Sequence, residues 1–471
     1  MREMREIAPH DRTPREWPPC GMDSRGARPP DGPSPRRLRR RGGWRRTWPL
    51  LALAALLSLS SCGEGGMIVS HGARGADQGP EPLVIWLWPG SGYEPLISRY
   101  NEEHDDVQVE IVRFDSQDLH ANLQTAFAAG YGAPDAVMID LSYMERFKRF
   151  PSYFHNLREL ASEPLDGRYL DWNWRQAASP DGSFVYALPA SIGPMTMLFR
   201  VSLYGQAGLP LDRGELADSL PDWDSFLRSG VVLRTRTGKP MIDNIVTLYR
   251  AILGQAEVQY FDAGTGAFIG DVSPAVREAW DYAVSAKVNG LSAGLQTGST
   301  EWAVGMEQGH FATLLAPAWM LSYVTENSPG AIRQWNMTRL PGGAANWGGW
   351  FFAIPRESRQ PDAAWKLIRW LTDDERQLEL FREQNIFPSL AALYDNSDVT
   401  SKRDGFFMGA PVGRLLSEAA HAIRPVYAGA GQPLVEDIME SALQKVENGL
   451  LSGDLAWEDA MRQIREALDK Q

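Results

Sequence analysis

The sequence predicts an α/β fold, and three observations support this prediction. Segments with the signals of strands alternate with segments that have the signals of helices from Leu83 onward. The chain has 471 residues, of which 44% are hydrophobic and 10% aromatic, as in globular rather than disordered proteins. No fixed-period repeat is visible. At the usual ~150 residues per domain, this length suggests about three units.

The first strand and helix signals lie close together and alternate strictly. Three apolar or alternating runs predict strands, and two runs with helical spacing predict the helices between them. In chain order these segments are 83–88, 92–104, 107–112, 119–130 and 136–140. Such units form parallel sheets, in which ligands bind beyond the carboxyl ends of the strands. Trp88 and Asp140 lie at two of these ends and are therefore candidate site residues.

Later segments continue the mixed pattern. A serine–proline start and a terminal glycine predict a helix at 273–290, and a capping box at 372–375 predicts the start of another. Short apolar runs that end at proline predict strands at 185–189 and 351–355. The α/β pattern therefore continues toward the C-terminus.

Residues 1–61 predict a basic leader and a lipoprotein signal peptide. Arginines precede an apolar run at 50–60, which at about eleven residues is shorter than the ~20 that span a membrane. The run ends in Leu-Ser-Ser before Cys62, which resembles a bacterial lipobox, where the cysteine receives diacylglycerol and becomes the first residue. We expect a lipidated Cys62 followed by a flexible tether at 62–80. The alternative is a signal peptide with an incidental cysteine.

Two details of the leader leave alternatives open. Met22 is an alternative start of the chain, and Arg45-Arg46 is an alternative, twin-arginine export signal.

The distribution of charge excludes one class of partner. Residues 1–62 contain 13 of the 47 Lys and Arg and 6 of the 59 Asp and Glu, so residues 63–471 carry a formal charge of -19. Binding of a phosphate backbone needs a basic surface, and we therefore expect no nucleic-acid partner. Cys20 and Cys62 are the two cysteines, too few for a disulfide framework or a cysteine metal cluster.

No catalytic motif is present. The chain lacks the H-E-x-x-H and G-x-S-x-G motifs and a P-loop, and the glycines of 264–270 are misplaced for a dinucleotide turn. We expect no catalytic residue, no cofactor and no metal. A glycosidase that uses two carboxylates stays open, because its residues need only converge in space.

Tryptophan is abundant, and several tryptophans are adjacent to glycine or proline. Of the 17 tryptophans, Trp319 follows Ala-Pro-Ala, and Trp347 and Trp350 flank Gly348-Gly349. Indoles offer flat faces for the apolar side of a sugar ring, and carboxylates or amides bind its hydroxyls. The sequence offers both, which indicates a sugar site. Three tryptophans at helical positions are expected in the core: Trp223, Trp280 and Trp365.

Seven segments together resemble the extracellular solute-binding protein family 1, the carbohydrate-binding lipoproteins of ABC importers related to maltose-binding protein. The segments occur in the order found in the family. They are VIWLWPGSGYEPLISRYNEEH (84–104), APDAVMIDLSYMERF (133–147), YALPASIGPMTMLFRVSLYGQAGL (186–209), DWDSFL (222–227), GHFATLLAPAWMLSYV (309–324), LPGGAANWGGWFFAIP (340–355) and AAWKLIRWLTDDERQ (363–377).

The resemblance implies a two-lobe periplasmic-binding-protein fold with a hinge and a ligand cleft between the lobes. It implies a first crossing near Ser191 to Pro194 and a return crossing near Gly309. The expected partition is 81–190 with 310–345 for the first lobe, and 191–309 with 346–471 for the second.

The resemblance also implies the residues that hold the ligand. Asp140 is expected to accept sugar hydroxyls and the tryptophans to stack on the ring. The full set is Trp88, Ser91, Asp140, Tyr143, Trp319, Trp347, Gly349 and Trp350. Two features depart from the family: the loop 89–94 lacks the carboxylate–lysine pair of maltodextrin binders, and Phe199-Arg200 replaces a polar strand end, which leaves Arg200 free to face solvent.

These observations predict an exported, lipid-anchored, non-enzymatic monomer on the periplasmic or extracellular side of the cell membrane. It would bind a mono- or oligosaccharide and deliver it to the transmembrane subunits of an ABC permease. Three alternatives remain: the same fold with a polyol, glycerol phosphate ester or polyamine; a secreted lipoprotein that degrades glycans; and a sensor subunit that signals through a kinase.

Overall fold

The structure is a computed structural model that describes residues 81–470. The predicted leader at 1–61, the lipidated Cys62 and the tether at 62–80 lie outside the described residues. The chain divides into two units, Met1–Ala73 and Arg74–Gln471, and the described residues belong to the second.

The predicted parallel strands are present. β1 (Leu83–Leu87) pairs in parallel with β2 (Val109–Arg113) and β3 (Ala136–Asp140). Helices α1 (Glu94–Glu103) and α2 (Ser116–Ala129) connect them, as the sequence predicted. β1 and β3 bury side chains on both faces, which explains why their sequences are almost continuously apolar, whereas β2 at the edge of the sheet is partly exposed.

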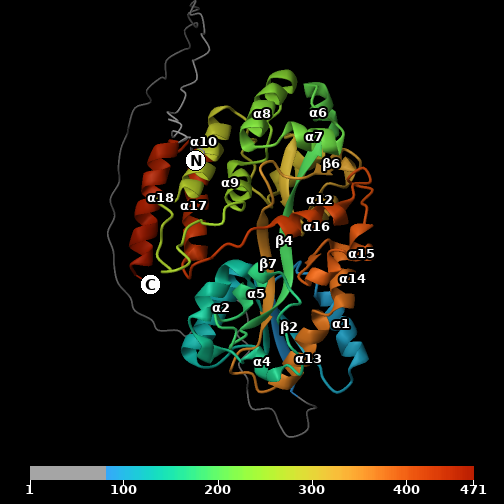
Figure 1. Ribbon diagram of the computed structural model, residues 1–471, viewed down its shortest axis with the longest axis vertical. Coiled ribbons are helices and arrows are strands. Elements are labelled where there is room, and N and C mark those ends of the chain that lie inside the picture. The colour runs from blue at the N-terminus through green and yellow to red at the C-terminus, as the bar shows by residue number, and fades with distance from the viewer. Residues whose placement is uncertain (1–80, 471) are drawn as a thin grey trace, which may run out of the picture. The chain divides into compact units, whose positions relative to one another are not determined.

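The longest strand, β4 (Ala187–Arg200), changes partners halfway along its length (Figure 1). Its first half pairs antiparallel with β7 (Asn346–Ala353) and β8 (Phe387–Pro388). Its second half pairs with β5 (Thr313–Pro317) and β6 (Trp335–Thr338). The change of partner falls between Pro194 and Met195.

We call the part built on β1, β2, β3 and β7 the first lobe, and the part built on β5, β6 and the second half of β4 the second lobe. This pairing differs from the expected partition, because β5 and β6 belong to the second lobe and β7 belongs to the first. A strand belongs to the sheet with which its backbone bonds, and β7 pairs with β3 from Val137 to Asp140. The chain therefore returns to the first lobe in the segment between β6 and β7, whereas Gly309 is the C-cap of α11 (Thr300–Gln308).

Four helices pack against one another in the second lobe (Figure 1). They are α9 (Ile245–Leu253), α10 (Pro274–Val288), α17 (Gln432–Glu447) and α18 (Gly453–Leu468). α10 begins after the predicted Ser273 cap.

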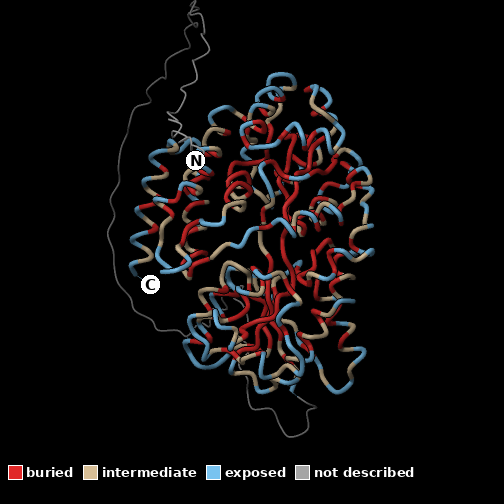
Figure 2. The backbone as a smooth tube through the Cα atoms, in the orientation of Figure 1, coloured by how far each residue is buried: buried red, intermediate tan, exposed pale blue. Residues whose placement is uncertain are grey.

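Trp223 and Trp280 are buried as predicted, whereas Trp365 is half-buried beneath the Arg369 guanidinium. Figure 2 shows buried residues running along β4 and through both lobes.

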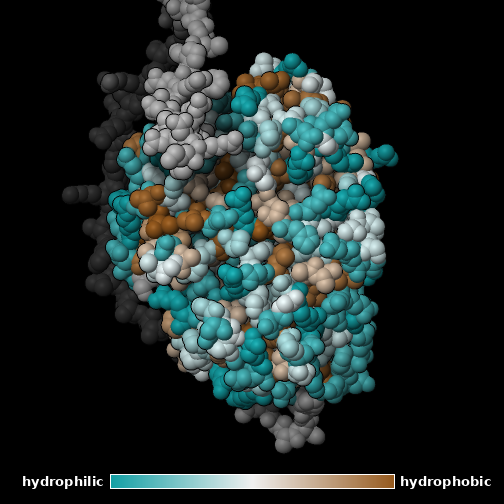
Figure 3. Space-filling view, viewed as in Figure 1, coloured by the Kyte–Doolittle hydropathy of each residue, from teal (hydrophilic) through white to brown (hydrophobic). Residues whose placement is uncertain are grey.

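The remaining helices cover the sheets and connect the strands. Their bounds are α3 Met144–Lys148, α4 Leu157–Leu160, α5 Asp171–Ala177, α6 Val201–Ala207, α7 Arg213–Ser219, α8 Trp223–Thr237, α12 Met320–Asn327, α13 Pro361–Leu371, α14 Asp374–Gln384, α15 Ser397–Thr400 and α16 Val412–Ala422, with 3-10 turns at η1 Leu141–Tyr143, η2 Pro151–Tyr153, η3 Pro329–Ala331 and η4 Ala391–Leu393. Within residues 81–470, none of the helices has both the length and the apolar composition needed to cross a membrane. The face in Figure 3 is mostly hydrophilic, and hydrophobic residues gather on it beside α17 and α18.

Two local predictions were wrong. The cap of α14 is Asp373, whose carboxylate accepts the Arg376 N–H at 2.8 Å, because Thr372 ends α13 and donates its hydroxyl hydrogen to Ile368. Arg200 is buried rather than solvated. Its guanidinium donates to the carbonyl of Met306 at 2.6 Å, at the end of α11, where a helix attracts cations.

Candidate binding site

Residues of three neighbouring strands lie side by side in the expected ligand-binding region of the first lobe. Asp140 of β3 and Ser191 of β4 are both directly opposite Trp350 of β7. Opposed residues of antiparallel strands project from the same face of a sheet. Trp88 follows β1, and its ring centroid lies 5.8 Å from that of Trp350, with the ring planes at 89°. The fold therefore brings Trp88, Asp140 and Trp350 together.

Asp140 has one carboxylate oxygen in use and one free. Its Oδ1 accepts the Ser142 N–H at 2.9 Å and the Ser142 hydroxyl at 2.7 Å, which caps η1. Oδ2 has no hydrogen-bond partner among the described residues. The side chain is half-buried, so Oδ2 is available to a ligand hydroxyl.

His120 supports this part of the site, and no sequence motif indicated it. Its Nδ1 lies 2.5 Å from the Ser116 carbonyl, and its Nε2 lies 3.0 Å from the Asp140 nitrogen. A carbonyl only accepts, so Nδ1 carries the hydrogen and Nε2 accepts the Asp140 N–H. Burial lowers the pKa of His120 to about 4, and the ring is neutral at neutral pH. Its place in the apolar stripe with Leu123 and Phe127 was the available signal.

Tyr143 stacks on the His120 ring, with centroids 3.8 Å apart and planes at 12°. Burial raises the pKa of Tyr143 to about 12, and the carboxylates of Asp437 and Asp140 act in the same direction. The phenol therefore keeps its hydrogen and can both donate to and accept from a ligand.

Trp319 and Trp347 form a second aromatic pair. The Trp319 Nε1–H donates to the Trp347 carbonyl at 3.1 Å, and the ring centroids are 5.7 Å apart. Gly349 has φ of 120°, and a Cβ there would lie 2.8 Å from the Ser191 carbonyl oxygen. Glycine at this position lets β7 approach β4 closely, which gives Gly349 a structural role.

Ser91 occupies the turn after Trp88. Its N–H donates to the Trp88 carbonyl at 3.3 Å, and the residue is fully buried. Its hydroxyl has no hydrogen-bond partner in the part of the chain that the structure describes. In this conformation Ser91 lies below the surface rather than on it.

Arg250 of α9 is a further site residue that the sequence did not indicate. Its guanidinium lies 4.7 Å from the centroid of the Trp347 ring and is hydrogen-bonded to Glu440 of α17. Burial opposes its charge, but Glu440, Glu436 and Asp140 attract the cation and together raise the pKa of Arg250. Arg250 is thus close to carboxylates of both lobes.

The acidic residues of α17 complete the arrangement. Glu436 accepts the Gln432 Nε2–H at 2.7 Å, and burial raises the pKa of Glu436 to about 7, although Arg250 opposes this rise. Asp437 accepts from Gln117 of α2 at 3.4 Å, which joins the two lobes. Across residues 81–470, no group of three or more His, Cys, Asp or Glu side chains is arranged to hold a metal ion.

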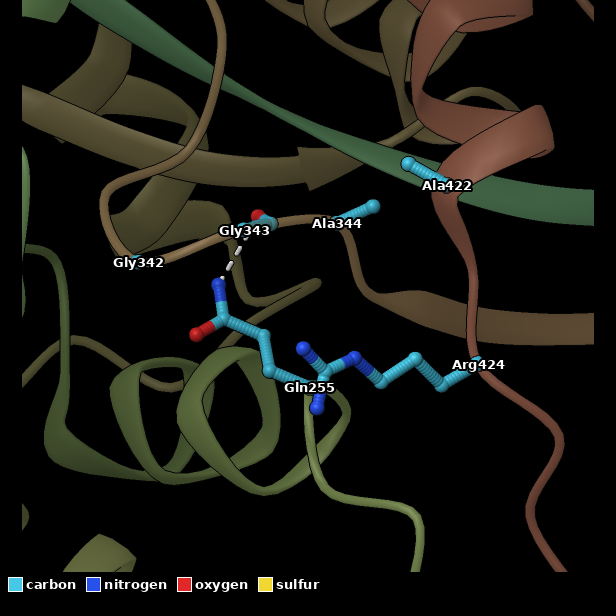
Figure 4. Close-up of a pocket in the computed structure, with 6 residues that line it drawn as sticks. All are labelled: Gln255, Gly342, Gly343, Ala344, Ala422 and Arg424. Carbon is cyan, nitrogen blue, oxygen red and sulfur yellow. Dashed lines mark hydrogen bonds between the residues drawn. The ribbon is translucent and has the colours of Figure 1, made fainter. Parts of the chain in front are cut away.

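A separate pocket lies beside the return crossing and contains none of the predicted site residues (Figure 4). Gln255 donates to the carbonyls of Pro341 at 2.7 Å and Gly343 at 2.9 Å and so fixes the crossing segment. The lining residues are Gln255, Gly342, Gly343, Ala344, Ala422 and Arg424. This pocket has no aromatic face or carboxylate, and the site described above is the better candidate for a sugar.

Comparison with known proteins identifies solute-binding proteins as relatives of this chain. Residues 96–406 match the family model of the bacterial extracellular solute-binding protein. An arabinooligosaccharide-binding protein of Halalkalibacterium halodurans is 22% identical over 280 residues, 56% of this chain and 60% of the relative. The chain thus spans less than two thirds of that relative. A lactose-binding protein of Rhizobium radiobacter is 24% identical over 350 residues, 70% of this chain and 80% of the relative.

Solved structures of solute-binding proteins share the fold of this chain. A crystal structure of an extracellular solute-binding protein family 1 member is 30% identical, covers 82% of this chain and 100% of its own, and has a TM-score of 0.75. The ABC transporter associated binding protein of B. animalis subsp. lactis Bl-04, in complex with β-1,6-galactobiose, is 19% identical, covers 82% and 98%, and has a TM-score of 0.67. The fold is therefore the two-lobe periplasmic-binding-protein fold, with its cleft between the lobes.

The family model covers well over half of the chain, and the resemblance inferred from the seven segments is confirmed. This chain belongs to the bacterial extracellular solute-binding protein family.

Proposed function

We propose that this protein is the lipid-anchored, non-enzymatic binding subunit of an ABC importer, which captures a mono- or oligosaccharide between its lobes and delivers it to the permease. One observation carries the proposal: Trp88 and Trp350 meet edge to face beside the free Oδ2 of Asp140. Trp88 is half-buried and Trp350 is buried behind it, so Trp88 offers the aromatic face next to the free acceptor, an arrangement that suits a sugar ring with its hydroxyls.

The relatives support a carbohydrate ligand. Two arabinooligosaccharide-binding proteins and a lactose-binding protein match the sequence, and structural neighbours have been solved with β-1,6-galactobiose and α-D-tagatose. We propose that this chain shares the ligand class of these proteins, and that it works as a monomer.

The electrostatics of the site argue against a glycerol phosphate ester. Arg250 is hydrogen-bonded to Glu440, and the carboxyl groups of Glu436 and Asp140 also act on its charge. A phosphate would have to displace them or add its charge to theirs. A neutral or cationic ligand fits this arrangement better.

Calorimetry with the full-length protein, purified in detergent, tests the proposal. The panel contains arabinooligosaccharides, lactose, galactobiose, a polyol, glycerol 3-phosphate and spermidine. At 100 times its dissociation constant, a specific sugar adds about 2.7 kcal/mol to the stability, which a thermal shift detects. Binding of a sugar, weakened in Asp140→Ala, is the expected result. Binding of glycerol 3-phosphate or spermidine without any sugar would contradict it, as would release of reducing ends from a polysaccharide.

A separate experiment tests the proposed lipid anchor at Cys62. Cys62→Ser should move the protein from the membrane fraction to the soluble exported fraction, because it removes the proposed lipid. Retention of the variant in the membrane would argue for an uncleaved or differently anchored leader.

A further inference from the structure

Two exposed aromatic side chains lie at one end of the first lobe. Tyr131 is 75% exposed and Phe150 is 47% exposed, and every other Phe, Tyr and Trp within residues 81–470 is buried or half-buried. The two rings belong to segments that touch each other. Tyr153 lies 5.5 Å from Phe150 and stacks at 4.7 Å on Phe127, in the last turn of α2. Exposed rings that gather on one surface are typical of a surface that meets a partner.

A loop after β7 joins the two aromatic segments. The Arg356 N–H donates to the Tyr153 carbonyl at 2.8 Å. The next residue, Glu357, accepts the Ala133 N–H at 3.3 Å, close to Tyr131 in the chain. The three segments are therefore continuous in space. We define the aromatic surface as their residues, 130–133, 149–153 and 356–360.

The aromatic surface lies beside the start of the described chain and at the opposite edge of the sheet from the candidate binding site. Gln360 Nε2 donates to the Glu81 carbonyl at 3.1 Å, two residues before β1. β1 and β3 both begin at this edge, whereas Trp88 and Asp140 lie where these strands end. Helices α4 and α13, which follow two of the three segments, lie at the end of the first lobe away from the second (Figure 1). A partner on this surface would leave the candidate site open.

The aromatic surface is less acidic than the rest of the body. Its one carboxylate is that of Glu357, and it has three exposed arginines: Arg149, Arg356 and Arg359. Its formal charge is +2, whereas residues 63–471 carry -19. Among the described residues none of these arginines pairs with a carboxylate, and the Arg149 guanidinium lies 6.0 Å from the centre of the Phe150 ring. The neighbouring Glu81 and Asp362 are acidic, so a partner has to contact the rings as well as the arginines.

We propose that the aromatic surface rests on the lipid bilayer, with the Tyr131 and Phe150 rings in the headgroup region and the arginines beside lipid phosphates. The inference rests on the proposed lipid anchor and adds a second contact with the same membrane. Aromatic side chains are enriched where proteins meet the headgroup region. Guanidinium groups pair well with phosphates.

The proposed anchor would keep this surface close to the membrane. Eighteen residues, 63–80, separate Cys62 from Glu81. Such a segment spans at most roughly 65 Å when fully extended, so Glu81 would stay near the bilayer. A tethered contact acts at an effective concentration of roughly millimolar, so a weak contact is sufficient. The aromatic surface, next to Glu81, is the part of the body that gains most from this tether.

A fluorescent label tests this orientation. The full-length chain is purified with its lipid and reconstituted into vesicles of phosphatidylcholine, with and without phosphatidylglycerol. Ser152→Cys carries a nitrobenzoxadiazole label on the aromatic surface and keeps both rings, and Glu458→Cys carries it on α18; both positions are exposed. Labelling of the unaltered protein checks that Cys20 and Cys62 do not react. We expect spin-labelled lipids to quench the label in Ser152→Cys and to leave the label in Glu458→Cys unquenched.

Removal of the rings should abolish this difference. Tyr131→Ser together with Phe150→Ser, in the labelled Ser152→Cys protein, should lose most of the quenching. Val288→Ser together with Leu450→Ser should keep it, because these side chains are 79% and 70% exposed but lie in the second lobe. Melting temperatures show whether each variant is folded. If the double aromatic variant does not fold, Tyr131→Ser alone provides the comparison and should lower the quenching.

The remaining outcomes separate this inference from the proposed anchor. Equal quenching at the two labelled positions, whether strong or absent, would overturn the inference and leave the anchor intact. Quenching that survives the loss of both rings would also overturn it. Protein that does not float with the vesicles would contradict both the anchor and the contact. Sugar binding is measured separately by calorimetry and does not depend on this result.

Discussion

The backbone N–H of Asp140 donates a hydrogen bond to Nε2 of His120 at 3.0 Å, so a buried histidine positions the residue at the end of β3. The opposite ring nitrogen donates to the Ser116 carbonyl, and one face of the ring supports Tyr143. A single side chain from α2 thereby fixes two predicted ligand residues without needing to touch the ligand.

The first prediction follows from this contact. His120→Leu should leave the Asp140 N–H without its partner, which costs about 1–3 kcal/mol for a buried group. We expect a lower free energy of unfolding in urea and weaker sugar binding by calorimetry. His421→Leu is the control, because His421 is exposed at the surface, where it lies 3.8 Å from the Asp395 carboxylate and its ring meets the Tyr394 ring edge to face. Equal stability of the two variants would contradict the positioning role.

The second prediction concerns the close approach of β7 and β4. Gly349→Ala should destabilise the protein by more than Gly130→Ala. Both glycines have positive φ, but a Cβ at Gly349 would lie 2.8 Å from a backbone oxygen, whereas at Gly130 nothing lies within 4 Å. Strain at positive φ alone costs of order 1–2 kcal/mol, and the clash adds to it only at Gly349. Urea unfolding of the two variants measures the difference, and an equal loss would show that β7 can move away from β4.

The parallel part of the first lobe could be predicted from the sequence because its signals are local. The apolar runs of β1 and β3 and the helical spacing of α2 each lie within a few residues, and the placement of Trp88 and Asp140 at strand ends follows from them. The topology rule then brings both to one edge of the sheet.

The lobe membership of β5, β6 and β7 could not be predicted in this way. β5 and β6 are short buried strands and β7 is longer, but none of the three sequences indicates which half of β4 the strand pairs with. Likewise, Arg250 and Glu440 are 190 residues apart and meet only in the folded chain. Neither belongs to a motif, so local patterns gave no reason to select them.

The third prediction tests the role of Arg250. Arg250→Met should leave Glu440 and Glu436 without their cation, which is costly because both carboxyls are partly buried. Removing one partner of a buried ion pair typically costs about 3–5 kcal/mol, and partial exposure here should keep the loss below that range. Arg462→Met, on the exposed side of α18, is the matched control. Similar melting temperatures for the two variants would show that Arg250 contributes no more than a surface pair.

The fourth prediction is a pH dependence with a defined direction. Burial raises the pKa of Glu436 to about 7, whereas a free glutamate titrates near ~4.3. Between these two values the native state holds a proton that the unfolded state has lost, so the contribution of Glu436 to stability falls as pH rises through this window. The Glu436→Gln variant lacks this pH-dependent contribution. The free energy of unfolding of the variant should therefore fall less between pH 5 and pH 7 than that of the unaltered protein. Asp243, whose pKa burial also raises to about 7, contributes in the same window and remains in both proteins. Glu458→Gln should behave like the unaltered protein, and an unchanged slope in Glu436→Gln would show that Glu436 ionises normally in the folded chain.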